Sequence, residues 1–156
     1  MSNDLYAVAR PGERYFSVAE ANALVPLLQR TFEDVRTARA AMRGHLSALR
    51  QSGDEPDPLT LEPAEGAAPD VVARYRDLRD LRDQVLDRLR QLSELGVEIK
   101  GADGLCDVRS RFQGRIVYLC WQAGEEQFAS WHELDAGFVG RQPIGDASAF
   151  EGSLLN

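Results

Sequence analysis

Side chains that can do chemistry are concentrated in residues 119–135. Both tryptophans, one of the two histidines, one of the two cysteines and four acids lie within these seventeen residues. No lysine or arginine occurs between Ile116 and Gly140, so no cation within this stretch competes for the carboxylates. A histidine nitrogen and carboxylate oxygens are both ligands of divalent metal ions. The sequence therefore predicts a candidate metal site formed by Asp107, Glu125 and His132.

His132 also has two other interpretations. Carboxylates near an imidazole raise its pKa and make it a proton-transfer group. Alternatively the region is structural, with Trp121 and Phe128 in the core and a histidine that is simply hydrogen-bonded. A nucleophilic pair of Cys120 and His132 is disfavoured, because tight turns between the strands would point these two side chains in opposite directions.

Arg141 follows a loop that glycines bracket at residues 137–140. An arginine at such a place can bind a carboxylate or phosphate in a bidentate manner. The candidate ligand-binding residues are therefore Arg141, Glu133 and Trp131. The favoured alternative is an ion pair of Arg141 with Glu133 or Asp135. The loop has neither the strand-to-helix context of a dinucleotide-binding motif nor the ending of a P-loop.

A first long helix is predicted over residues 16–51. Ser17 and Glu20 have the spacing of a capping box at its start. Small and apolar residues then recur at alternating spacings of four and three, which is typical of a helix with a packed seam. Pro26 removes one backbone donor and predicts a bend near Asn22 rather than a break.

A second helix is predicted over residues 70–96, after an acidic, proline-rich loop at 52–69 that shows no periodicity. The two helices are expected to form a long antiparallel hairpin. Apolar residues beside the seams are more numerous than one partner helix needs, which predicts a homodimer. These residues are Leu27, Phe32, Leu46, Leu81, Leu86 and Leu95.

The period of the apolar residues changes to two after Gly96, which predicts a sheet over residues 97–134. The expected strands are 105–112, 115–122 and 127–134, with a short fourth at 97–100. With tight turns, the predicted core face carries Cys106, Val108, Phe112, Val117, Leu119, Trp121, Phe128 and Leu134. The opposite face carries Asp107, Arg109, Arg111, Tyr118, Cys120 and Glu133, with Asp107 directly across from Cys120.

The predicted fold class is α+β, with the long antiparallel hairpin packed on a small antiparallel sheet of three to four strands. All 156 residues are expected to form a single domain, in which residues 135–156 are irregular. The formal net charge of −7 argues against a nucleic-acid partner. No signal peptide or apolar run of membrane-spanning length occurs, which predicts a cytoplasmic protein without a membrane partner.

The chain resembles an uncharacterised bacterial family catalogued as domain of unknown function 2203. The residues that carry the resemblance are Tyr15-Phe16-Ser17, Gly104-Leu105-Cys106-Asp107, Leu119-Cys120-Trp121, Gly124-Glu125, Trp131-His132-Glu133 and Gly140-Arg141. Members typically have an aliphatic residue in place of Cys106. The resemblance implies that Asp107, Glu125, His132 and Arg141 are the polar signature of the family, and it implies no activity.

Two classes of function remain open at this point. One is a non-catalytic binding or interaction protein, whose expected partner is a second copy of the chain, bound through the helical hairpin. The other is a small site for a divalent metal or an anionic ligand near His132, whether enzymatic or not.

Overall fold

The structure, a computed structural model, describes residues 14–153 and is of the α+β class, as predicted. Its contacts divide the chain into two compact units, one formed by residues 14–32 with 90–153 and the other by residues 33–89. The helices are α1 (Val18–Ala23), α2 (Val25–Gln51) and α3 (Pro69–Glu94). The strands are β1 (Glu98–Gly101), β2 (Leu105–Phe112), β3 (Arg115–Gln122), β4 (Ser130–Glu133), β5 (Gln142–Pro143) and β6 (Phe150–Glu151).

Two expectations concern residues outside this range, namely the expected absence of a signal peptide at the start and the expected irregular structure of the last three residues. Among the residues described, no helix combines the length and the apolar character that crossing a membrane requires.

The first predicted helix is interrupted at Leu24. Ser17 caps α1 as expected, since its hydroxyl accepts the Glu20 amide and the Glu20 carboxylate accepts the Ser17 amide. The bend predicted near Asn22 is instead a break between α1 and α2. Pro26 has no N–H to donate to the carbonyl four residues earlier. The Leu24 amide closes a tighter turn, with a 3.0 Å bond to a carbonyl only three residues back.

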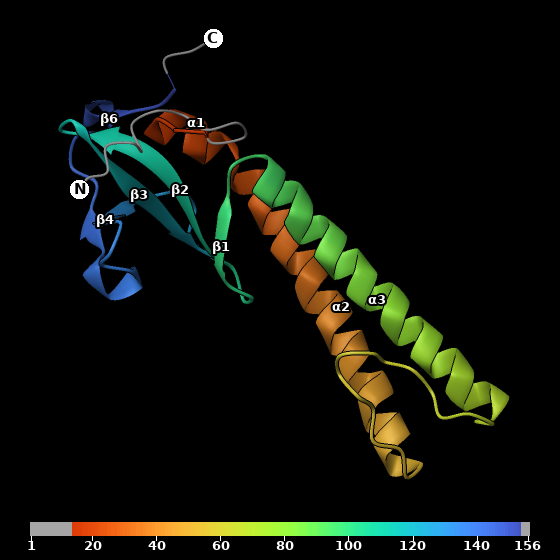
Figure 1. Ribbon diagram of the computed structural model, residues 1–156. Helices are drawn as coiled ribbons and strands as arrows, with labels where there is room; N and C mark the ends of the chain where they lie inside the picture. Colours follow the sequence, from red (N-terminus) through yellow and green to blue (C-terminus); the bar gives the residue numbers. More distant parts are fainter. Residues whose placement is uncertain (1–13, 154–156) are drawn as a thin grey trace. The chain divides into compact units, whose positions relative to one another are not determined.

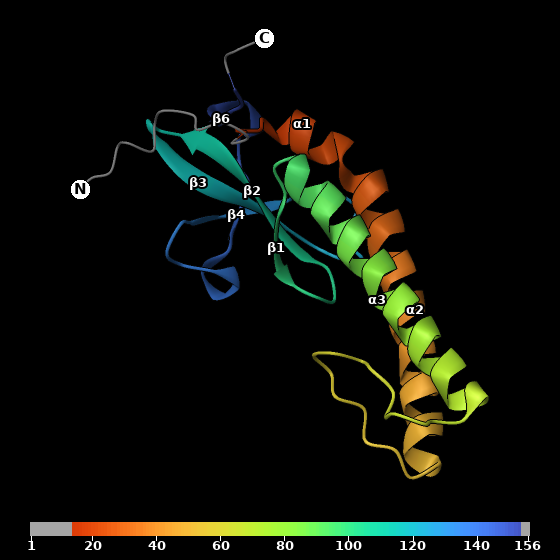
Figure 2. The ribbon, with the colours of Figure 1, turned by 45° about the vertical axis from the view of Figure 1, so that its right-hand side comes forward.

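The sheet has the strand order β1-β2-β3-β4-β5, and β6 pairs with the far end of β2. Neighbouring strands in it are antiparallel, and β1, β2 and β3 lie side by side in both ribbon views (Figures 1 and 2). The bounds of β2 and β3 are those predicted, and Gln113 and Gly114 form the turn between them with positive φ angles.

The third predicted strand is shorter and has another register. It covers Ser130–Glu133 rather than 127–134. Its ladder places His132 opposite Tyr118, and directly opposite residues share a face of the sheet. Cys120 is two residues from Tyr118 and is therefore on that face as well. The prediction that Cys120 and His132 face opposite ways is wrong.

The connection between β3 and β4 explains this register. The Phe128 amide donates to the side chain of Asn22 at 2.7 Å instead of to a neighbouring strand. The Trp121 indole donates to the Glu125 carbonyl at 3.0 Å, and the Glu125 carboxylate accepts the Gln122 amide at 2.7 Å. The connection is thus longer than a tight turn, and a shift by one residue moves every later side chain to the other face.

The segment after β4 is more regular than predicted, because it adds β5 and β6 to the sheet. Within residues 14–153 the strands therefore number six rather than three or four. The Phe150 ring on β6 stacks on Phe112 with 4.5 Å between ring centroids. Strands of two residues have no periodicity that a sequence could display, so packing alone identifies them.

One face of the sheet forms the core of the first unit, with Trp121 near Phe32 of α2 at 6.3 Å between ring centroids. Most residues predicted for this face are fully buried: Cys106, Val108, Val117, Leu119, Trp121 and Phe128. The prediction that Leu134 lies on the core face is wrong, because the changed register leaves its side chain 41% exposed.

The unit of residues 33–89 has a small core of its own. Leu49 and Leu78 pack with Tyr75 and with Leu61 from the loop between α2 and α3. The Tyr75 hydroxyl donates to Asp54 of the same loop at 2.8 Å. Side chains of this loop therefore cover one end of the two helices.

Candidate metal centre

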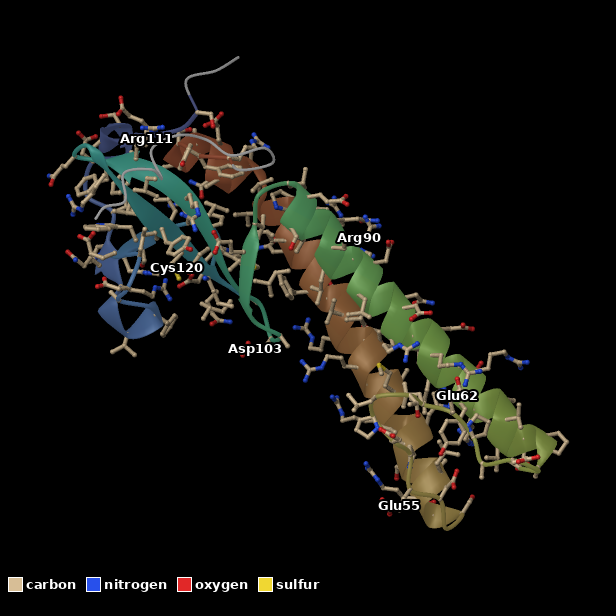
Figure 3. The ribbon with its side chains drawn as sticks, viewed as in Figure 1. Glu55, Glu62, Arg90, Asp103, Arg111 and Cys120 are labelled. Atoms are coloured by element: carbon tan, nitrogen blue, oxygen red, sulfur yellow. The ribbon has the colours of Figure 1, made fainter. Side chains whose placement is uncertain are left out.

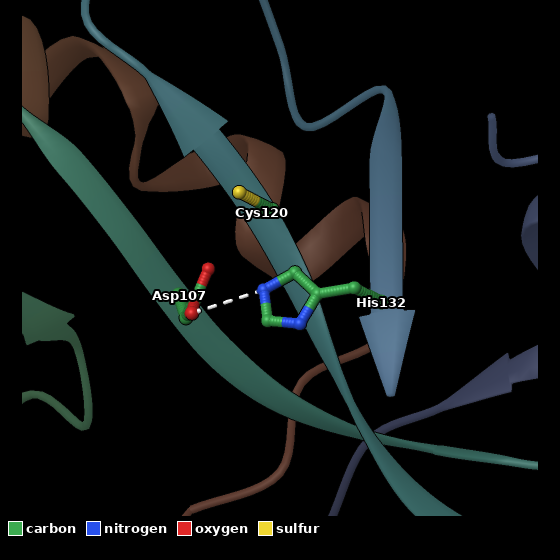
Figure 4. Close-up of side chains that lie close together, drawn as sticks. All are labelled: Asp107, Cys120 and His132. Carbon is green, nitrogen blue, oxygen red and sulfur yellow. Dashed lines mark hydrogen bonds and ion pairs between the residues drawn. The ribbon is translucent and has the colours of Figure 1, made fainter. Parts of the chain in front are cut away.

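Three adjacent strands bring three metal-ligating side chains to one point. Asp107 on β2, Cys120 on β3 and His132 on β4 are all buried, and one ligand atom from each lies within 4.8 Å of the others. Asp107 lies directly opposite Cys120 in the ladder, as the sequence predicted. Figure 3 shows Cys120 within the sheet, and Figure 4 shows the three side chains converging.

The hydrogen bonds of His132 determine which ring nitrogen is available. Nδ1 lies 2.8 Å from the backbone carbonyl oxygen of Glu133. A carbonyl can only accept, so Nδ1 carries a hydrogen. Nε2 lies 3.1 Å from Oδ2 of Asp107. Either a proton or a metal ion must therefore lie between Nε2 and the carboxylate. Metal-ligating histidines usually donate their other ring nitrogen to a carbonyl or carboxylate in this way.

Asp107 has one carboxylate oxygen that no nitrogen or oxygen donor satisfies. Oδ1 is buried and has no such donor among the described residues, and the Cys120 thiol is the neighbouring group that hydrogen-bonds the carboxylate. A buried carboxylate with an unsatisfied oxygen is costly unless a proton or a cation compensates it. Oδ1 is therefore an open ligand position at the centre.

The Cys120 thiol is protonated when no cation is bound. Burial, followed by the negative charge of Asp107, raises the pKa of Cys120 to about 12. A metal ion reverses this preference, because a coordinated thiol loses its proton. The same raised pKa argues against a nucleophilic cysteine. Both nitrogens of His132 already have partners other than the thiol, so a cysteine–histidine dyad is not formed.

A cavity of about 130 Å³ adjoins the three side chains. Gly137 lines one side of it and has a φ of 67°, which few other residues adopt. The remaining lining is one cation, one aromatic hydroxyl and several apolar side chains: Lys100, Tyr118, Leu105, Leu134 and Phe138. A ligand at the centre would thus have room on one side.

A charged network borders this cavity. The Tyr118 hydroxyl donates to Glu98 at 2.7 Å, and Arg109 and Lys100 contact the same carboxylate at 2.9 and 3.2 Å. Burial raises the pKa of Glu98, but the bonds from Tyr118, Arg109 and Lys100 outweigh it and hold the pKa below its usual value. The Tyr118 ring lies 5.4 Å from the His132 ring between centroids. The network therefore holds the Tyr118 ring in place against the His132 ring.

Glu125, predicted as a metal ligand, has other partners. Its carboxylate accepts the Gln122 amide at 2.7 Å and pairs with Arg141 at 2.8 Å. Arg141 also donates to the Ser130 hydroxyl at 3.0 Å. Arg141 is thus paired, as favoured, but with Glu125 rather than with Glu133 or Asp135.

The three candidate ligand-binding residues are not brought together. Glu133 and Trp131 lie on the sheet face opposite His132, whereas Arg141 reaches Ser130 on the face of His132. The Glu133 carboxylate binds Arg115 at 2.6 Å, and the Trp131 ring packs on Phe112 at 4.8 Å.

Cys120 is the candidate ligand that sequence reasoning missed. The signal existed, because Asp107 was already expected directly across from it. The wrong register of the third strand hid the relation, since it turned His132 away from both residues.

The comparisons with known proteins show a family and no activity. Residues 14–144 match the family DUF2203, described as an uncharacterized conserved protein. No curated protein and no solved structure matches the chain. The match covers most of the sequence and includes all three residues of the centre. The chain therefore belongs to the DUF2203 family.

Proposed function

We propose that this protein binds a divalent metal ion of the zinc class through Asp107, Cys120 and His132. The observation that carries the proposal is the convergence of three buried ligand atoms within 4.8 Å of one another, beside an Oδ1 of Asp107 that has no nitrogen or oxygen donor among the described residues. A nitrogen, a sulfur and a carboxylate oxygen form a ligand set that suits zinc better than magnesium or calcium.

The spacing of the ligand atoms fits this ion. Ligand bonds of zinc are about 2.0 to 2.3 Å, so tetrahedral ligand atoms lie roughly 3.3 to 3.8 Å apart. The three atoms here lie within 4.8 Å of one another. A movement of about 1 Å closes them around an ion. Three protein ligands leave a fourth position for water or a small ligand, as in catalytic rather than structural zinc sites.

The test is metal analysis of the full chain purified without an affinity tag. We expect about one equivalent of Zn²⁺ per chain and recovery of the ion after removal by a chelator. Asp107→Asn, Cys120→Ser and His132→Gln should each weaken Zn²⁺ binding at least about hundredfold in competition with a chromogenic chelator. Glu125→Gln and Cys106→Ala are matched controls and should bind as the parent chain does. Absence of stoichiometric binding, or equal loss in Glu125→Gln, contradicts the proposal.

We propose as a second candidate function that the long helices, as an antiparallel hairpin, mediate a homodimer. Within residues 33–89, Leu86 is 58% exposed, and a hollow of about 390 Å³ is lined by both α2 and α3. Its apolar lining consists of Val35, Ala38, Ala41, Leu81 and Val85. Residues 70–96 carry six acids and six bases, so two copies meet without net repulsion. The molar mass in solution tests this proposal.

The cytosol is the compartment that we propose for both functions. The two cysteines are free thiols on opposite faces of the sheet, and free thiols persist in a reducing compartment.

A further inference from the structure

We infer that the fourth coordination position takes a small monoanion with an apolar body, of the short-chain carboxylate class. This inference rests on the metal site proposed above and names what that site binds. It depends on three properties of the cavity next to the centre, namely its size, its charge and its apolar rim.

The cavity limits the size of the ligand. It has a volume of about 130 Å³ and is lined by all three proposed metal ligands. This volume holds about ten non-hydrogen atoms at the space that a water molecule needs. A metabolite of a few carbons fits, whereas a nucleotide or a folded peptide does not.

The charges around the cavity favour a single negative charge. The two charges of a zinc-class ion are balanced by the Asp107 carboxylate and the Cys120 thiolate. Lys100 lines the cavity, and its partner Glu98 also accepts bonds from Arg109 and Tyr118. A monoanion at the open position would lie beside this ammonium group, whereas a dianion such as phosphate would bring a second negative charge into a largely buried place where no second cation stands among the described lining residues.

The rim of the cavity is apolar and exposed. Leu134 and Phe138 line it and are 41% and 46% exposed. Leu105 adds a third apolar side chain. The guanidinium of Arg141 lies 4.6 Å from the centroid of the Phe138 ring, which limits the movement of that ring. An apolar group on the ligand would cover these side chains and remove their surface from water.

The test uses the full chain loaded with Co²⁺, whose visible spectrum reports the ligand at the open position. The probes are acetate, butyrate, 1-butanol and inorganic phosphate. We expect saturable spectral changes with both carboxylates and about tenfold tighter binding of butyrate, since it adds two methylene groups. 1-Butanol and phosphate should bind at least about tenfold more weakly than butyrate.

Variants separate the contributions of charge and rim. Lys100→Met should weaken the binding of both acetate and butyrate about tenfold. It should leave the affinity for Co²⁺ unchanged. Phe138→Ser should remove most of the difference between the affinities of the protein for butyrate and for acetate. Val139→Ser is the matched control, because Val139 is on the same turn but is 97% exposed and does not line the cavity.

The outcomes distinguish this inference from the metal site itself. Co²⁺ binding with equal responses to butyrate, 1-butanol and phosphate, or with none, overturns the inference and leaves the metal site standing. Failure of the parent chain to bind Co²⁺ or Zn²⁺ overturns both.

Discussion

Asp107 is the residue on which the charge of the centre depends. One oxygen faces Nε2 of His132, and the other has no nitrogen or oxygen donor among the described residues, with only the weakly donating Cys120 thiol beside the carboxylate. Removing both carboxylate oxygens from water costs several kcal/mol unless a positive charge compensates. A proton between Nε2 and Oδ2 satisfies one oxygen only. A metal ion would satisfy the carboxylate and also accept the sulfur of Cys120, which a proton cannot do.

The two buried thiols predict a loss of stability in mildly alkaline solution. Burial, followed by the charge of Asp107, raises the pKa of Cys106 and of Cys120 from 9.0 to about 12. At pH 9 the folded chain keeps both protons, whereas the unfolded chain has released half of them. The stabilisation is therefore complete below about pH 8 and is lost as the pH rises toward 12. Urea unfolding of the metal-free protein should show a decline near pH 9 of about 0.7 kcal/mol per pH unit for each thiol.

The variant Cys106→Ala provides the control for this pH dependence. It removes one of the two thiols, so the decline near pH 9 should be half as steep. An unchanged slope in this variant would show that groups other than the thiols cause the decline.

At the scale of elements, β2 and β3 were predictable to the residue because the Gln-Gly pair marks the turn between two eight-residue runs rich in strand-forming residues. The register of β4 was not predictable, because it depends on the bond between Asn22 and the Phe128 amide, residues that are 106 positions apart. Asp107 and His132 were therefore identified from residue type alone. Their common partner Cys120 required the correct register.

A substitution of Asn22 tests whether its bond to the Phe128 amide holds the register of β4. Asn22→Ala leaves the Phe128 amide without an acceptor, which should lower the free energy of unfolding by about 1 to 3 kcal/mol in urea. It should also weaken Zn²⁺ binding, since β4 carries His132. Gln29→Ala is the control, because its side chain makes only a 3.5 Å contact with the Glu125 carbonyl. Its effect should stay below about 0.5 kcal/mol. Equal effects of the two variants would exclude a special role for Asn22.

At the scale of the whole molecule, the net charge of −7 is unevenly distributed along the chain. Residues 52–69 contain five acids and no base, whereas residues 70–96 are balanced. Repulsion between two copies would thus come from the loop rather than from α3. The balanced helix α3, with the hollow that it lines together with α2, can therefore face a second copy without net repulsion from its own charges.

The proposed homodimer leads to a prediction about the molar mass of the full chain in solution. Light scattering at micromolar concentration should give twice the mass of one chain. Leu86→Glu should return the protein to the mass of one chain, because it places a charge on the apolar surface of α3 that a second copy would cover. Leu59→Glu is the control, since Leu59 is 87% exposed in the loop and its substitution adds the same charge without touching the helices. A parent chain that has the mass of one copy contradicts the homodimer. Dissociation by both variants alike would instead attribute association to net charge.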